Sequence, residues 1–125
     1  MLEIMRVMWY NTMGCDTMKT IDKAAWQIDG GVPAEKVVSH FRMMFEWLAS
    51  HGMLTEDGEE ELEDGIDDCA VINDELVNGE GMAFLKGCYD DLLKAAAKVY
   101  GSTESLSVLE GIYRKYCVDT RLSRG

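Results

Sequence analysis

The 125-residue chain has little proline: Pro33 is its single one, and no proline- or glycine-rich stretch marks a linker between two domains. No apolar run approaches the roughly 20 residues needed to cross a bilayer. The N-terminus has an early acid, Glu3, and lacks the apolar core ending in small residues of a secretory signal. We therefore expect one domain, residues 1–125, with no membrane span and a cytoplasmic location.

The chain also lacks the common motifs of metal, redox and phosphate chemistry. No C-x-x-C pair occurs, which argues against a zinc knuckle or a thioredoxin-type site. The glycine-rich loops that cradle phosphates are missing, and neither His40 nor His51 has an acid three or four residues earlier. We expect no enzyme, no cofactor and no dedicated metal site. An enzyme with an unfamiliar site would have to be recognised by titratable groups clustered in a pocket.

The four cysteines are expected to be free thiols. Each lies on or next to an apolar position of an expected helix, and buried thiols are common in proteins of a reducing compartment. Their positions are Cys15, Cys69, Cys88 and Cys117.

Lys and Arg are absent from residues 55–80, which contain twelve acids. The formal net charge of the whole chain is -11, so nearly all of the excess charge lies in this segment. Such a single-sign field attracts cationic partners and repels nucleic acids and anionic membranes. The acids are Glu56, Asp57, Glu59, Glu60, Glu61, Glu63, Asp64, Asp67, Asp68, Asp74, Glu75 and Glu80.

The pattern of apolar residues in this segment predicts one amphipathic helix, with a possible break at Gly65. Thr55 is its expected N-cap, and Leu62, Ile66, Cys69, Asn73, Leu76 and Val77 fall on one side of a helical wheel, opposite most of the charges. Six i,i+4 pairs then carry like charges, at a cost of about 0.2–0.5 kcal/mol each. A merely solvated face would intersperse Lys or Arg, so we favour a functional face over this simpler interpretation.

The predicted function is binding of a basic protein surface, including that of a nuclease or another nucleic-acid-binding protein. The chain has the size, acidity and lack of catalytic motifs of small inhibitors such as immunity proteins, nucleic-acid mimics and phage antagonists of host defence. Val71 lies among the acids on the wheel and is a candidate apolar anchor. The predicted contact residues are Glu56, Asp57, Glu60, Glu61, Glu63, Asp64, Asp67, Asp68, Val71, Asp74 and Glu75.

An alternative function is a structural or adaptor subunit that forms a homodimer. Nine methionines are many for this length, and surfaces rich in Met and aromatic residues serve adaptable contacts. Met43 and Trp47 lie beside the main apolar stripe of their helix. They are either part of the core or an apolar contact surface.

Helical periodicity dominates the rest of the chain and predicts an all-α, single-domain bundle of five or six helices with short connections. Expected helices run from Asp16 to Gly30, from Pro33 to about Gly52, from Asn78 to about Tyr100, and from Ser102 onwards. Residues 1–13 are also expected to be helical, although a strand is the open alternative, and residues 118–125 are expected to fray.

Overall fold

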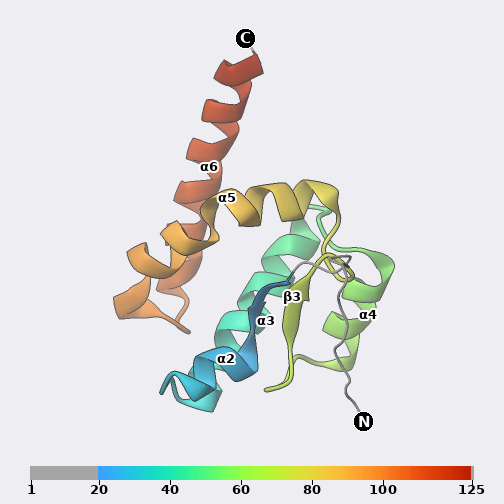
Figure 1. Ribbon diagram of the computed structural model, residues 1–125, viewed down its shortest axis with the longest axis vertical. Helices are drawn as coiled ribbons and strands as arrows, with labels where there is room; N and C mark the ends of the chain where they lie inside the picture. Colours follow the sequence, from blue (N-terminus) through green and yellow to red (C-terminus); the bar gives the residue numbers. More distant parts are fainter. Residues whose placement is uncertain (1–19, 125) are drawn as a thin grey trace, which may run out of the picture.

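The computed structural model describes the backbone of residues 20–124 and the side chains of residues 20–120 (Figure 1). The expectations for residues 1–13 and for Asp16 lie outside this part. Within it, five α-helices accompany a two-stranded sheet, so the expectation of a helical protein is confirmed and that of a purely α-helical bundle is wrong. The elements are β2 (Thr20–Lys23), α2 (Ala24–Asp29), α3 (Ala34–Ser50), α4 (Glu56–Asp64), β3 (Val71–Asn73), α5 (Gly79–Ala95), the 3₁₀ turn η2 (Ala97–Val99) and α6 (Glu104–Arg124).

Helix α3 forms the centre of the core and closely follows the sequence prediction. Pro33 precedes its first turn, and Gly52 lies just beyond its end with a φ of 69°, a conformation that glycine adopts without strain. The main apolar stripe of this helix, Val37, Phe41, Met44 and Leu48, is fully buried. Helices α2 and α4 both pack against α3.

The predicted helix before Gly30 is only partly formed. Residues Thr20–Lys23 are instead the strand β2, which pairs antiparallel with β3 in a register that matches Lys23 with Val71. The pairing continues one residue further, where the Ala24 N–H donates to the Ala70 carbonyl at 2.9 Å. Partners about fifty residues away therefore decide the conformation here, and a short helical pattern cannot reveal them.

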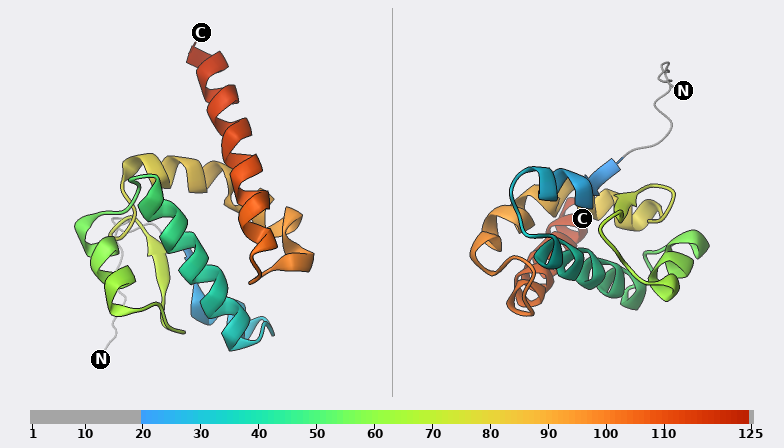
Figure 2. Two further views of the ribbon diagram at one scale, coloured as in Figure 1. Left: turned by 180° about the vertical axis from the view of Figure 1, so that it is seen from behind. Right: turned by 90° about the horizontal axis from the view of Figure 1, so that it is seen from below.

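Helices α5 and α6 pack against one another at the side of the molecule away from α4 (Figures 1 and 2). Asn78 caps α5 by accepting a hydrogen bond from the Gly81 N–H at 3.0 Å. Helix α6 continues to Arg124, and the expectation that residues 118–125 fray stays a prediction. No Gly or Pro interrupts residues 112–124, and the C-terminal half of α6 projects beyond the other elements (Figure 1).

Candidate functional site

The acidic segment does not form the single helix that its apolar spacing predicts. Helix α4 ends at Asp64, and the chain then makes a loop, the short strand β3 and a turn before α5. The predicted contact residues accordingly occupy different elements. Glu56, Asp57, Glu60, Glu61, Glu63 and Asp64 lie on α4, Asp67 and Asp68 in the loop, Val71 in β3, and Asp74 and Glu75 in the turn.

Local side chains explain why the helix stops. Gly65 has a φ of 106°, outside the helical region and rarely adopted by other residues. Beyond it, Asp67 Oδ1 accepts a hydrogen bond from the Cys69 N–H at 2.9 Å. Asn73 Oδ1 similarly accepts from the N–H groups of Glu75 and Leu76 at 3.0 and 3.2 Å. Such short polar side chains satisfy backbone groups in turns and compete with helix formation.

The segment nevertheless folds into one compact unit, because its two ends are joined at Thr55. The Thr55 N–H donates to the Leu76 carbonyl at 3.0 Å, and Leu54 and Val77 form an isolated antiparallel bridge. We call residues 55–75 the acidic lobe. Its helix α4 lies on the side of the molecule opposite the base of α6 (Figure 2).

The negative charge of the lobe faces solvent. All twelve acids of the 55–80 segment are exposed. Among the described side chains, the one ion pair joins His51 and Glu110, so no described Lys or Arg neutralises the lobe. Four of the six expected like-charge pairs lie within α4, whereas Glu63/Asp67 and Asp64/Asp68 cross its end. The carboxylates of Asp68 and Asp67 raise the pKa of the exposed Cys69 thiol, as expected in a strongly negative field.

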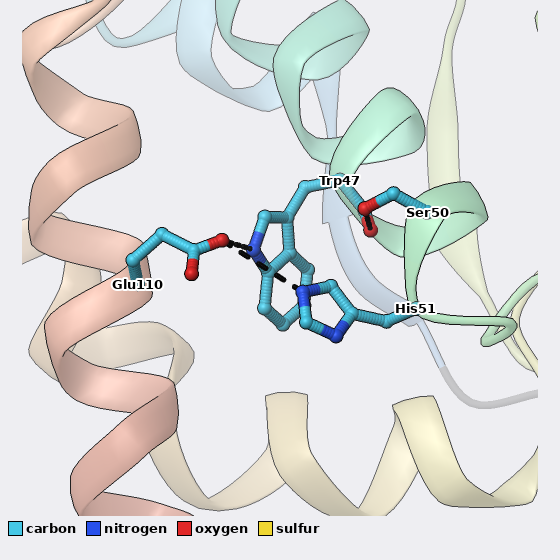
Figure 3. Close-up of polar contacts among 4 residues, drawn as sticks. All are labelled: Trp47, Ser50, His51 and Glu110. Atoms are coloured by element: carbon cyan, nitrogen blue, oxygen red, sulfur yellow. Dashed lines mark hydrogen bonds and ion pairs between the residues drawn. The ribbon is translucent and has the colours of Figure 1, made fainter.

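The three apolar candidates, Val71, Trp47 and Met43, lie in different surroundings. Val71 is half-buried in β3 and is not part of the charged face of α4. Trp47 is only 3% exposed and belongs to the core, while Met43 is half-buried beside it. The indole N–H of Trp47 donates to Glu110 Oε1 of α6 at 2.6 Å, and His51 Nε2 lies 3.7 Å from the same oxygen (Figure 3).

A buried polar cluster surrounds His40, where the sequence carries no local motif. The Tyr89 hydroxyl donates to Asp22 Oδ2 at 2.5 Å and lies 2.9 Å from His40 Nε2. Since a phenol has one proton, His40 must donate through Nε2, which leaves Nδ1 as its unprotonated atom. That Nδ1 atom is buried without a hydrogen-bond partner, as is the hydroxyl of Tyr100, whose ring stacks on His40 at 4.4 Å between centroids.

Burial controls the protonation of this cluster. It lowers the pKa of His40 to about 4 and raises the pKa of Tyr89. It also raises the pKa of Asp22, against the opposing effect of hydrogen bonds from Tyr89, Gln27 and the Lys23 N–H. The members are 49 and 67 residues apart along the chain, so no spacing rule could have found them.

A cavity of about 390 Å³ lies beside this cluster, between the start of α3 and the end of α5. Gln27 and Tyr100 line it, whereas Asp22, His40 and Tyr89 do not. A molecule in the cavity would therefore meet the outer members of the cluster and not its titratable interior.

Comparison with known proteins gives no family model, no curated protein and no solved structure that matches this chain. In the part of the chain that the structure describes, no helix combines the length and the apolar character required to cross a bilayer.

Proposed function

We propose that this protein binds a basic protein surface through the acidic lobe and blocks access to that surface. The observation that carries the proposal is the exposed, un-neutralised charge of the lobe: all eleven of its acids face solvent, and no described Lys or Arg forms an ion pair with them. The natural complement is a surface of Arg and Lys residues, such as the groove in which a nuclease or another nucleic-acid-binding protein holds its phosphates. Inhibition would follow from occupying that groove.

The backbone of the lobe supports this function because it holds the carboxylates in a defined arrangement. Thr55, Asn73 and Asn78 all bond their side chains to main-chain groups at the two ends of the lobe. An ordered set of carboxylates loses less conformational entropy on binding than a disordered acidic tail does. It can also match the spacing of particular cations on a partner.

The energetics of α4 support the same conclusion. Its four internal like-charge pairs cost about 0.8–2 kcal/mol when the typical cost per pair is summed. Interspersed Lys residues would remove this cost. A basic partner would remove it as well, and long-range attraction would raise the association rate about 10–10³-fold at low salt.

The alternative function, self-association through Met43 and Trp47, has weaker support. The Trp47 ring contacts Phe84 and Tyr113 of the same chain, at centroid distances of 5.5 and 5.0 Å. To reach a second copy, it would have to leave its own core.

The proposal is tested by capture of a partner from the native host on the immobilised protein, at about 50 mM and about 500 mM salt. The test variant replaces Glu60, Asp64, Asp67 and Asp68 by Gln or Asn. A control variant removes the same number of charges from exposed acids outside the lobe, Asp29, Glu46, Asp90 and Asp119. Net charge is thus equal in the two variants, and only its position differs.

We expect a basic protein to be captured at low salt, to be lost at high salt, and to be displaced by nucleic acid. The lobe variant should lose it and the control variant should retain it. Equal loss from both variants would mean that net charge alone acts, and capture that survives in the lobe variant would contradict the proposal.

A further inference from the structure

The cavity beside the buried cluster has a charge opposite to that of the protein. It is lined by residues of α2, the start of α3, the end of α5 and η2, among them Gln27, Lys36, Lys98 and Tyr100. The charged members are the two lysines, and no acid lines the cavity, although the chain has a formal net charge of -11. No described carboxylate forms an ion pair with either Lys36 or Lys98. Two free ammonium groups at one cavity favour an anionic occupant.

The position of the cavity adds to this preference. Pro33 and Lys36 lie at the start of the 17-residue helix α3, whose first turn has no side-chain cap and carries one exposed acid, Glu35, which does not line the cavity. Aligned peptide dipoles place about half a positive charge at such a helix end. The ammonium groups and the helix end therefore act with the same sign.

The remaining walls are suited to a small organic molecule. Val32, Pro33, Leu93 and Ala97 supply an apolar surface, and the volume of about 390 Å³ lies in the range of small-molecule sites. Gln27 Nε2 donates to both oxygens of Asp22, at 3.1 and 3.0 Å, so its Oε1 atom remains to accept a hydrogen bond. This amide also stands between the Asp22 carboxylate and the cavity.

The fold holds Tyr100 against α3 through a close backbone contact. Gly101 has a φ of 82°, and a Cβ atom there would lie 2.8 Å from the Lys36 carbonyl oxygen. Only glycine allows both the conformation and the approach. The Tyr100 wall and the Lys36 end of α3 are thus fixed relative to each other, which defines the shape of the site.

We propose that this cavity binds a small organic anion, in which a carboxylate or phosphate group lies between Lys36 and Lys98 and a compact apolar body rests on Val32, Pro33 and Leu93. The proposal is independent of the acidic lobe, which lies at α4. It therefore needs no partner protein for its test.

The test is titration of the full chain with benzoate and with phenyl phosphate, followed by amide chemical shifts. Benzamide, which is neutral and nearly isosteric with benzoate, is the ligand control. We expect the anions to shift the amides of Gly31, Val32, Ala97 and Gly101, and benzamide to bind at least tenfold more weakly. The tighter of the two anions identifies the preferred head group.

The matched variants are Lys36→Met and Lys98→Met, which keep the length and apolar stem of the side chain. Each should weaken anion binding about tenfold, as expected for loss of one charge-assisted hydrogen bond. Lys94→Met, an exposed site outside the cavity, should leave binding unchanged. Amide spectra of the free variants establish that they fold, and Lys→Gln replacements serve if a Met variant does not.

Three results would overturn the proposal. One is that neither anion binds with a dissociation constant below about 10 mM. The second is equal binding of benzamide, and the third is anion binding that Lys36→Met and Lys98→Met leave unaffected.

Discussion

The hydroxyl of Thr55 donates a hydrogen bond of 2.7 Å to the main-chain carbonyl of Glu75 and so closes the acidic lobe on itself. The same hydroxyl accepts from the Gly58 N–H at 3.1 Å and thereby caps α4. The Thr55 side chain thus caps the first turn of α4 and holds the main chain at Glu75 next to it. The start of α4 and the turn at Asp74 and Glu75 are joined for this reason.

The close approach at this junction predicts a large effect of Gly58→Ala. A Cβ atom at Gly58 would lie 2.1 Å from the Leu76 carbonyl oxygen and 3.1 Å from its carbon, so the backbone must move. We expect the free energy of unfolding, measured by urea denaturation, to fall by about 1–3 kcal/mol, as for other overpacked sites. Amide exchange in α4 should become faster than in α3.

Gly87→Ala is the matched control, since Gly87 also lies within a helix but is exposed, and a Cβ atom there would have no neighbour within 4 Å. Alanine there should raise the free energy of unfolding by about 0.5–1 kcal/mol through its higher helix propensity. If Gly58→Ala were equally stabilising, the junction between α4 and Leu76 would not be packed as described.

The sequence predicted the elements whose signals are local. Helix α3 combines Pro33 before its first turn, a buried stripe and Gly52 after its end, and α5 begins at Gly79, next to the expected start at Asn78. The strand β3 was missed because Ile66, Cys69, Asn73 and Val77 have helical spacing. The turn chemistry of Asp67 and Asn73, and pairing with a strand about fifty residues away, overrode that pattern.

The candidate sites differ in the same respect: the acidic segment could be predicted from local sequence, and the buried cluster could not. The excess negative charge of the acidic segment could be predicted from its residue types, because a segment without Lys or Arg has no basic side chain of its own to neutralise it. The cluster of His40, Tyr89 and Asp22 could not, because its members converge only in the folded chain. The two lysines of the cavity also lie far apart in sequence, on α3 and η2.

Neutralising Glu60 should stabilise the protein while weakening the proposed function. Glu60 lies four residues from both Glu56 and Asp64 on α4, so Glu60→Gln removes two repulsive pairs. We expect a gain of about 0.4–1 kcal/mol in the free energy of unfolding at low salt. The gain should shrink at about 1 M salt, where charges are screened beyond about 3 Å.

Glu104→Gln is the comparison for this effect. Glu104 lies in the first turn of α6, where a negative charge interacts favourably with the helix dipole. Its neutralisation should lower stability by a few tenths of a kcal/mol. A loss of stability in Glu60→Gln as well would show that the α4 charges do not repel one another appreciably.

The buried state of His40 predicts how stability depends on pH. Burial lowers its pKa from 6.5 to about 4, so the unfolded chain binds a proton more readily than the folded one. The stability contributed by neutral His40 is fully present above pH 6.5 and is lost as the pH falls towards 4. The loss at this site is about 3 kcal/mol. His40→Gln should flatten this part of the pH profile, measured by denaturation at fixed temperature.

Asp22 acts in the opposite direction. Its raised pKa means that its contribution is present below its unfolded pKa of 3.8 and is lost as the pH rises through its folded value. Asp22→Asn removes this opposing titration and should make the profile steeper above pH 3.8. An unchanged slope in His40→Gln would contradict the assignment of the pH dependence to His40.

The hydrogen bond between Trp47 and Glu110 predicts an energetic coupling between α3 and α6. Trp47→Phe keeps an aromatic ring against Phe84 and Tyr113 but removes the indole N–H that donates at 2.6 Å. A hydrogen bond to a charged group contributes about 1.5–3 kcal/mol, and partial exposure of Glu110 places the expected loss at the lower end. Guanidinium denaturation monitored by circular dichroism measures it.

A double-mutant cycle of Trp47→Phe and Glu110→Ala separates this bond from the loss of packing. If the two groups interact, the double variant should lose about 1 kcal/mol less than the sum of the single variants. Additive losses within about 0.5 kcal/mol would mean that ring packing alone joins the helices. Glu110→Gln keeps an acceptor oxygen without the charge, so it should lose less than Glu110→Ala. Since His51 lies 3.7 Å from the same oxygen, a residual coupling in Trp47→Phe that disappears in His51→Ala would assign the remainder to the imidazole.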